Sequence, residues 1–286
     1  MNTIPVYVGF DQREAAVFHV FNQSVIEHAT QPVSIHPLAT KQLQFNGQQD
    51  GTNAFIFSRY LVPALQDFKG WAIFADGDMI VNADIAELWA LRDDSKAVMV
   101  VKHDYKTRSS RKYRGSPIEN DNLDYPRKNW SSVVLFNCGH PANRILTRGY
   151  VAEAGGAVLH RFAWLRDEDI GELPMEWNWL EGEYENNPDA KLVHHTLGTP
   201  GFGYYQDSAS SPAWNRYLLN ALEIVGERQS EMVRRAHWNS YGSNYKLRDS
   251  ANGGGGLSGE KRSNLVHPQL HSERGEQALS NAQSQK

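Results

Sequence analysis

Two aspartates one residue apart follow a short apolar segment in the first third of the chain. Residues 71–75 (Trp-Ala-Ile-Phe-Ala) precede Asp76, Gly77 and Asp78. Such a run is typical of a buried strand, and side chains two residues apart on an extended chain point to the same side. Gly77 would let a second backbone or a ligand approach closely. Two carboxylates at the end of a buried strand suit Mg²⁺ or Mn²⁺ that also holds a substrate phosphate.

The same pattern also occurs where a strand simply ends and the next helix is capped, because Asp-x-Asp is short. The position of Asp76 and Asp78 directly after a predicted core strand makes the metal interpretation about as strong as this structural one. Other segments of the sequence are needed to distinguish the metal interpretation from the structural one.

The elements around the two aspartates predict an α/β fold with a parallel sheet. Residues 4–10 and 33–38 have the composition of strands, and residues 13–30 have the apolar spacing of a helix. Ligands in such sheets bind beyond the carboxyl ends of the strands, so the loop after the first strand is expected at the same rim as the aspartates. This first loop contains Val8, Gly9, Phe10 and Asp11.

Basic residues are predicted near this rim. Arg59 lies in a predicted helix over residues 55–68 and could reach a phosphate or ribose with two hydrogen bonds, or else pack its stem on the surface. Residues 102–114 contain six Lys or Arg residues. We expect either a solvated loop or a loop that contacts a phosphate-bearing substrate.

An acidic cluster precedes an aromatic segment later in the chain. The cluster consists of Asp167, Glu168 and Asp169, and the segment after it contains Trp177 and Trp179. It is either a solvated turn or a sugar site, since sugar rings stack on tryptophan while carboxylates accept hydrogen bonds from hydroxyls.

Two further predicted strands end in polar residues. Residues 130–136 lead into Asn137, a candidate contact for a sugar hydroxyl. Residues 191–193 lead into His194 and His195. A histidine at a strand end is either a third metal ligand or an ordinary polar edge residue.

The composition describes a folded protein of a reducing compartment. The chain has 286 residues, 40% of them hydrophobic and 11% aromatic, enough for a large core. A net charge of -4 excludes a general nucleic-acid binder, which needs a strongly basic face. The single cysteine, Cys138, excludes an internal disulfide. With neither a signal peptide nor a membrane-spanning stretch in the sequence, we expect a cytoplasmic protein.

The end of the chain differs from the rest. From Asp249 onward there is no Phe, Tyr or Trp, and residues 253–256 are all glycine. Without aromatic side chains such a segment cannot bury enough apolar area to fold. We predict a single domain over residues 1–248 and a disordered tail over residues 249–286.

Taken together, these segments resemble the GT-A-fold glycosyltransferases, most closely the retaining family 8 group that includes glycogenin and bacterial lipooligosaccharide galactosyltransferases. The similar segments follow the family's order between residues 4 and 203. They are the first loop and residues 58–60 (Ser-Arg-Tyr), 74–78 (Phe-Ala-Asp-Gly-Asp), 135–139 (Leu-Phe-Asn-Cys-Gly), 167–170 (Asp-Glu-Asp-Ile) and 193–198 (Val-His-His-Thr-Leu-Gly). The resemblance implies an α/β, Rossmann-like GT-A domain with a mixed, mostly parallel sheet flanked by helices.

The resemblance also implies a metal site. Asp76, Asp78 and a histidine would hold Mn²⁺ or Mg²⁺ on the diphosphate of a nucleotide sugar, with Asp76 also close to the ribose. Matching of positions favours His194 as that ligand, although the extra Leu197 before the glycine keeps His195 open.

Further residues take roles by the same resemblance. The donor would be held by Val8, Gly9, Phe10, Asp11, Arg59, Asp76 and Gly77. The catalytic candidates are Asn137, Asp167 and Glu168.

Two departures from the family pattern bear on the mechanism. Members commonly have Asp-Gln-Asp at the position of residues 167–169, and the middle residue is thought to lie beneath the anomeric carbon. Glu168 therefore opens a route through a covalent glycosyl intermediate, beside the same-face attack that analogy favours. The usual Lys-Pro-Trp after the histidine is replaced by residues 198–203, which leaves the lysine contact to the diphosphate unassigned.

The expected function is transfer of a hexose from a nucleotide-diphosphate sugar, by default a UDP-sugar, to a glycan acceptor in polysaccharide biosynthesis, with retention. Lipid-linked acceptors would bring the protein to the inner leaflet as a peripheral protein. One alternative is a metal-dependent nucleotidyltransferase or phosphohydrolase, which would not need the late histidines. Another is a non-catalytic carbohydrate-binding protein, in which the paired aspartates would be incidental.

Overall fold

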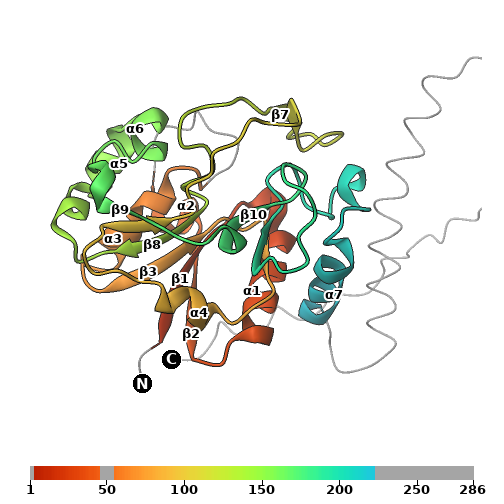
Figure 1. Cartoon of the computed structure of the whole chain (residues 1–286), viewed down its shortest axis with the longest axis horizontal. Helices are drawn as coiled ribbons and strands as arrows, with labels where there is room; N and C mark the ends of the chain where they lie inside the picture. The colour runs from red at the N-terminus through yellow and green to blue at the C-terminus, as the bar shows by residue number, and fades with distance from the viewer. Residues whose placement is uncertain (1–2, 46–54, 223–286) are drawn as a thin grey trace, which may run out of the picture. The chain divides into compact units, whose positions relative to one another are not determined.

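The computed structural model describes residues 3–45 and 55–222. Its larger sheet contains β1 (Ile4–Gly9), β2 (Val33–Leu38), β3 (Trp71–Ala75), β5 (Val98–Val100), β8 (Val133–Asn137) and β9 (Ile170–Glu172), in the order β2-β1-β3-β8-β5-β9 (Figure 1). β1 pairs parallel with β2 and β3, and β5 pairs parallel with β9. β8 is antiparallel to both of its neighbours. The predicted mixed, mostly parallel sheet is confirmed.

Helices cover both faces of this sheet. One face carries α1 (Ala15–His28) and α4 (Ile85–Ala90), and the other carries α3 (Val62–Leu65), α5 (Arg148–Glu153) and α6 (Gly156–His160). Successive strand residues point to opposite faces, so Val6 and Ile73 pack in the first core and Tyr7 and Phe74 in the second.

A smaller sheet continues from the end of β3. It contains β4 (Met79–Val81), β10 (Trp179–Leu180) and β11 (Leu192–His194), in the order β10-β11-β4. Only residues 76–78 separate β3 from β4, so the chain passes from one sheet to the other at the paired aspartates. α1 packs against α7 (Ser211–Ala221) over this sheet, in a core that includes Val20, Val193 and Trp214.

The remaining elements are short. They are α2 (Thr40–Leu43), a hairpin of β6 (Arg111–Lys112) and β7 (Asn120–Asp121), and 3₁₀ helices at Gln12–Glu14, Ser58–Leu61, Pro141–Ile145, Asp167–Asp169, Met175–Asn178 and Gly203–Tyr205. Among the described residues, no helix has the length and apolar character needed to span a membrane.

The helix predicted over residues 55–68 is not one continuous helix. Residues 55–68 form a turn, a 3₁₀ helix and then α3, with Pro63 in the first turn of α3, where its missing N–H is tolerated. The predicted tail, residues 249–286, lies outside the described residues.

Gly77 stands where the ends of β1 and β3 meet. A methyl group on its Cα would lie 2.5 Å from the carbonyl oxygen of Gly9. That contact is with backbone, which cannot move aside as a flexible side chain would. The close backbone approach expected at Gly77 is therefore confirmed, and it holds the first loop against the paired aspartates.

We expect Gly77→Ala to lower the free energy of unfolding by about 1–3 kcal/mol, because the added methyl group forces the two strand ends apart. Gly149→Ala is the matched control. Gly149 lies on α5, and a methyl group added to it would have no neighbouring atom outside the helix backbone within 4 Å. The control should be neutral or more stable by about 0.5–1 kcal/mol. Urea unfolding measures both, and equal effects would contradict the steric argument.

Candidate active site and metal centre

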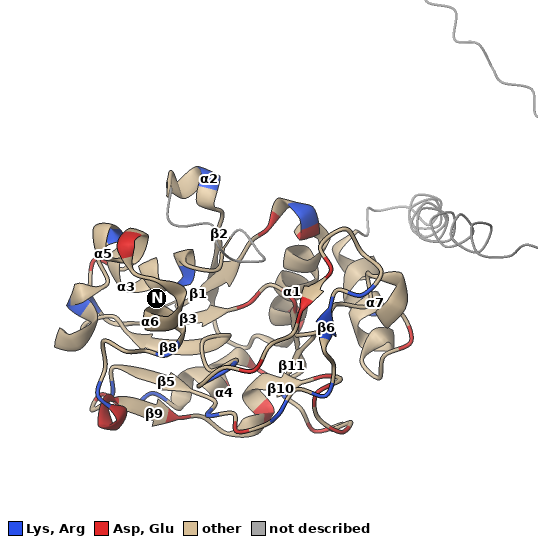
Figure 2. Cartoon of the chain, turned by 90° about the horizontal axis from the view of Figure 1, so that it is seen from above, with Lys and Arg blue, Asp and Glu red and all other residues tan. Residues whose placement is uncertain are grey.

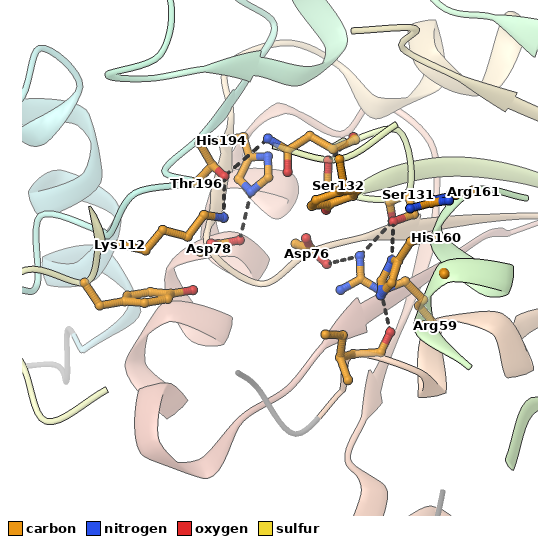
Figure 3. Close-up of a pocket in the computed structure, with 16 residues that line it drawn as sticks. Arg59, Asp76, Asp78, Lys112, Ser131, Ser132, His160, Arg161, His194 and Thr196 are labelled. Atoms are coloured by element: carbon orange, nitrogen blue, oxygen red, sulfur yellow. Dashed lines mark hydrogen bonds and ion pairs between the residues drawn. The ribbon is translucent and has the colours of Figure 1, made fainter. Parts of the chain in front are cut away.

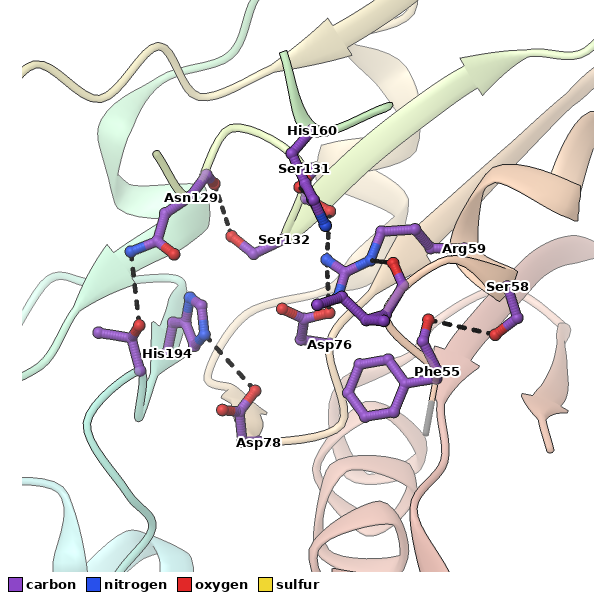
Figure 4. Close-up of polar contacts among 12 residues, drawn as sticks. Phe55, Ser58, Arg59, Asp76, Asp78, Asn129, Ser131, Ser132, His160 and His194 are labelled. Carbon is purple, nitrogen blue, oxygen red and sulfur yellow. Dashed lines mark hydrogen bonds and ion pairs between the residues drawn. The ribbon is translucent and has the colours of Figure 1, made fainter. Parts of the chain in front are cut away.

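Asp76, Asp78 and His194 come together where the chain leaves the larger sheet (Figures 3 and 4). The backbone N–H of Asp76 donates a hydrogen bond of 2.9 Å to the carbonyl of Ser132. His194 ends β11 and pairs with Met79 of β4, which places its imidazole beside Asp78. The candidate ligand atoms of the three side chains lie within 4.8 Å of one another, and all three side chains are largely buried.

The chemistry of this cluster fits a divalent cation. Asn178 uses its amide nitrogen as donor to Ser132 Oγ and the Asn129 carbonyl, so its Oδ1 is the acceptor for Nδ1 of His194, 3.1 Å away. A neutral His194 that donates through Nδ1 offers the lone pair of Nε2, which lies 3.5 Å from Oδ1 of Asp78. That oxygen is buried and has no hydrogen-bond partner among the described residues. Two facing lone pairs of this kind fit a shared cation.

Burial and neighbouring charges set the protonation of the two carboxyl groups. Burial raises the pKa of Asp76 to about 6, against the opposing effect of the Arg59 guanidinium. Burial alone would also raise the pKa of Asp78, but positive charge beside it, from His194 in its protonated form and from Lys112, holds that pKa below its usual value. A cation bound to His194 Nε2 in place of that proton would act on Asp78 in the same direction. Asp78 is therefore ionised at neutral pH, as a metal ligand must be.

His195 points elsewhere. Its Nδ1 lies 3.1 Å from the backbone carbonyl of Asp78, and its Nε2 lies 2.7 Å from Ser210 Oγ and 3.4 Å from Glu181. Both ring nitrogens thus have partners outside the cluster. The structure brings His194 to the carboxylates, and His195 holds the Asp78 backbone instead.

Arg59 is buried and already engaged. Its Nε donates to the Ile56 carbonyl at 3.0 Å, and one terminal nitrogen lies 2.8 Å from the Ser131 carbonyl and 2.9 Å from Asp76 Oδ1 (Figure 4). The guanidinium also stacks over the Phe74 ring, 4.9 Å from its centroid. These contacts show Arg59 positioning Asp76; the direct phosphate or ribose contact expected from the sequence has no support in them.

A cavity of about 360 Å³ opens beside the cluster. Its size falls in the usual range for small-molecule sites. The polar and charged residues that line it are Arg59, Asp76, Asp78, Lys112, Asn129, Ser131, Ser132, His160, Arg161, His194 and Thr196 (Figure 3).

Asn129, Ser131 and Ser132 are functional candidates that the sequence reasoning missed. They directly precede β8, which runs antiparallel to β3, so the start of β8 lies beside Asp76. The signal available in the sequence was the Ser131-Ser132 pair before an apolar run, but its value depends on the direction of the strand.

The three predicted catalytic residues lie at the other edge of the sheet. Asn137 is paired with Trp71, at the opposite end of β3 from Asp76, and its amide donates to the Lys96 carbonyl at 3.1 Å. Asp167 and Glu168 precede β9, which runs parallel to β5. Figure 2 shows acidic residues at the start of β9, on the opposite side of the view from the basic strand β6. The structure does not bring these three residues to the cavity, because β8 reverses direction and β9 begins at the far edge.

The sugar-stacking surface suggested by the sequence is not formed. Trp177 is 1% exposed and belongs to the core under α4. Trp179 donates its indole N–H to the Glu185 carbonyl at 2.9 Å. Neither ring stands beside the acidic cluster as a platform for sugar.

The first loop lies next to the cluster of Asp76, Asp78 and His194, as predicted. Gly9 and Asp11 line a small hollow together with Gly77, Asp78 and Tyr113. Asp11 is 5% exposed and accepts a hydrogen bond of 2.9 Å from the backbone N–H of Arg13. Val8 is buried within β1, and Phe10 packs edge-on against Phe18. The hollow and the larger cavity share Asp78, so the cluster stands between them.

Residues 6–139 match the sequence profile of Glycosyl transferase family 8. Protein CDI of Arabidopsis thaliana is 41% identical over 243 residues, which cover 81% of this chain and 90% of that protein. The chain belongs to glycosyl transferase family 8. It is a glycosyltransferase, and the alternatives of a phosphohydrolase or a non-catalytic sugar-binding protein are set aside.

Two further proteins are similar to it. Glycosyltransferase 8 domain-containing protein 1 of Danio rerio is 24% identical over 192 residues, 65% of this chain and 50% of that protein. The solved apo structure of the WbbM bifunctional glycosyltransferase superposes with a TM-score of 0.51 at 15% identity, over 82% of this chain and 51% of that one. This likeness shows the fold, and the chain spans about half the length of each of these two proteins.

We expect His194→Gln to weaken Mn²⁺ binding about 100-fold or more, because it removes a ligand. His195→Gln should change Mn²⁺ affinity less than about threefold, since both nitrogens of His195 bond to other groups. Titration of Mn²⁺ followed by electron paramagnetic resonance measures both affinities. A larger loss in the His195 variant would show that the histidines have been assigned in the wrong order.

The stability of the fold should depend on pH through His160. Its Nδ1 lies 2.9 Å from both Tyr60 Oη and Ser131 Oγ, and burial, with help from Arg59, lowers its pKa to about 3. Between the unfolded pKa of about 6.5 and about 3, the unfolded chain takes up a proton that the folded chain does not, so stability falls as pH falls.

His160→Asn keeps an acceptor near Nδ1 and removes this titration. Near pH 5, we expect the slope of unfolding free energy against pH to be smaller by about 1.4 kcal/mol per pH unit than in the wild type. Urea unfolding from pH 4.5 to 6.5 measures both slopes. If the wild type and the variant had the same slope of unfolding free energy against pH, His160 would have the same pKa in the folded and the unfolded chain, contrary to the prediction.

Proposed function

We propose that this glycosyltransferase moves a hexose from a nucleotide-diphosphate sugar, by default a UDP-sugar, to a glycan or glycoconjugate acceptor, with retention of configuration. The observation that carries the proposal is the buried cluster of Asp76, Asp78 and His194 on the wall of a cavity of about 360 Å³. Family membership supplies the reaction class, and oxygen-rich ligand sets with one imidazole suit Mn²⁺ or Mg²⁺.

The arrangement of the two hollows supports an order for the parts of the donor. Gly9, Asp11 and Gly77 line the smaller one, which has a volume of only about 10 Å³, so they would contact one edge of the nucleoside without enclosing it. Asp76, Asp78 and His194 would hold the metal, which when bound supplies charge neutralisation for the leaving diphosphate. The larger cavity, with Asn129 and the two serines before β8, would take the sugar and the attacking acceptor.

The chain's own residues keep these groups in place. Arg59 fixes the orientation of Asp76, and Asn178 fixes the ring of His194. Both supporting residues are buried, so water does not compete for these contacts. The ligands are thus positioned before the donor binds.

The lining of the cavity favours same-face attack over a covalent intermediate. In the part of the chain that the structure describes, the only carboxylates lining the cavity are Asp76 and Asp78, and both serve the metal. Glu168 has 67% of its side chain exposed and forms an ion pair of 2.5 Å with Arg166, away from the cavity. We therefore propose that the departing phosphate, and no protein carboxylate, assists the acceptor on the face that it leaves.

The purified protein should release a nucleoside diphosphate slowly from one member of a panel of nucleotide sugars, even without acceptor. Release should require Mn²⁺ or Mg²⁺, stop with EDTA, and fall about 100-fold or more in Asp78→Asn, because the leaving charge is no longer neutralised. Liquid chromatography of the products measures the release and names the donor.

Glu168→Gln separates the two retaining routes in the same assay. Same-face attack predicts turnover within about twofold of the wild type and no trapped glycosyl adduct by mass spectrometry. A large loss or an adduct on Glu168 would contradict the proposed route. If no nucleotide sugar turns over with either metal, the proposed donor class is wrong.

A further inference from the structure

A leaving diphosphate carries more negative charge than one divalent metal neutralises, and the Arg59 guanidinium on the cavity wall is already ion-paired with Asp76. Its Nε and one terminal nitrogen already contact Ile56, Ser131 and Asp76, and its side chain is 5% exposed. An arginine with these partners cannot turn toward a ligand without breaking its ion pair with Asp76. A second basic residue has to be considered.

Lys112 lies on the opposite side of the paired aspartates from Arg59 (Figure 3). It lines the cavity, and its Nζ donates a hydrogen bond of 3.0 Å to Thr196 Oγ1. An ammonium group has three donors. Within the described residues, Nζ of Lys112 makes only this hydrogen bond. No carboxylate of the described residues lies within ion-pair distance of Nζ. Lys112 thus has donors to spare for a ligand anion.

The hairpin that carries Lys112 is docked at this position. The Tyr113 backbone N–H donates to the Leu197 carbonyl at 2.6 Å, and the Arg114 N–H donates to Tyr205 Oη at 3.2 Å. Tyr113 is 5% exposed and has a φ of 53°, a conformation that a bulky residue adopts only when tertiary contacts hold it there. The hairpin therefore presents Lys112 to the cavity in a defined place.

We propose that Lys112 is the direct cationic contact for the diphosphate of the donor, in place of Arg59 and of the lysine that family members carry after the histidine. The proposal rests on the proposed function, because it assumes a nucleoside diphosphate at the metal cluster. An ammonium on a flexible stem suits a phosphate whose charge grows as the glycosidic bond breaks. A basic hairpin strand thus supplies the charge that the segment after His195 lacks.

Lys112→Met tests this by two binding measurements, of which only the first should show a loss of affinity. Calorimetry with UDP and with GDP, in saturating Mn²⁺, first shows which nucleoside diphosphate the wild type binds. The affinity of the variant for that nucleoside diphosphate should be about tenfold or more lower. Mn²⁺ alone should bind the variant as tightly as the wild type or tighter, since a positive charge has been removed beside Asp76 and Asp78. Lys106→Met is the control, because Lys106 lies in the same loop with 89% of its side chain exposed.

Unchanged affinity for the diphosphate in Lys112→Met would overturn the proposal. Weakened binding of Mn²⁺ alone would also overturn it, since Lys112 would then act by holding Thr196 and the histidine segment in place. Lys112→Arg, which keeps the charge, should recover part of the lost affinity. Failure of the wild type to bind either nucleoside diphosphate would instead contradict the proposed function, which keeps the two ideas separable.

Discussion

Asp76 and Asp78 are buried side by side, and the electrostatic cost of that arrangement governs the rest of the site. Two unit charges about 5 Å apart repel by about 3 kcal/mol at an effective dielectric constant of about 20. Arg59, 2.9 Å from Asp76, offsets part of this repulsion, yet the pKa of Asp76 still rises to about 6. A purely structural cluster would gain stability by losing one acid. A divalent cation explains better why both are present and why an imidazole nitrogen faces them.

The fold assembles this cluster from two sheets. β3 ends at Ala75 in the larger sheet, directly before Asp76, and β4 begins directly after Asp78 in the smaller one. Pairing of β4 with β11 then sets His194 opposite Met79. The three ligands are therefore positioned by strand pairing and not by a flexible loop, and Gly77 allows the crossing to pass close under β1.

The candidate metal ligands could be predicted from the sequence, but the positions of the three predicted catalytic residues could not. Asp76 and Asp78 form a local pattern, because two acids two residues apart after an apolar strand point to the same side of the chain. Asn137 follows a predicted strand, so whether it reaches the sugar depends on the direction of that strand in the sheet. Residues 133–137 have the same apolar pattern in either direction, and only their long-range pairing with β3 shows that β8 runs backwards. Its first residues, not its last, therefore reach the cavity.

Burial is the second property that the sequence conceals. Arg59 and Lys112 are both basic residues near a predicted phosphate site. The residues next to them in the sequence do not indicate which of the two is free to contact a phosphate. In the folded protein the charge of the arginine is already ion-paired with Asp76, while no carboxylate among the described residues lies within ion-pair distance of the lysine. The mid-chain acids at 167–169 show the same effect, because an acidic run reads alike whether it faces a cavity or the solvent.

The charges that line the cavity also determine how its ligands should depend on one another. Arg59, Lys112 and Arg161 stand against Asp76 and Asp78, so the lining alone is nearly balanced. A bound divalent cation makes it strongly positive, which a diphosphate then neutralises. Each ligand lowers the electrostatic cost of the other, and the coupling between two sites is necessarily reciprocal. Metal and diphosphate should therefore bind with positive cooperativity, so that the leaving diphosphate is bound most tightly when the metal is also bound.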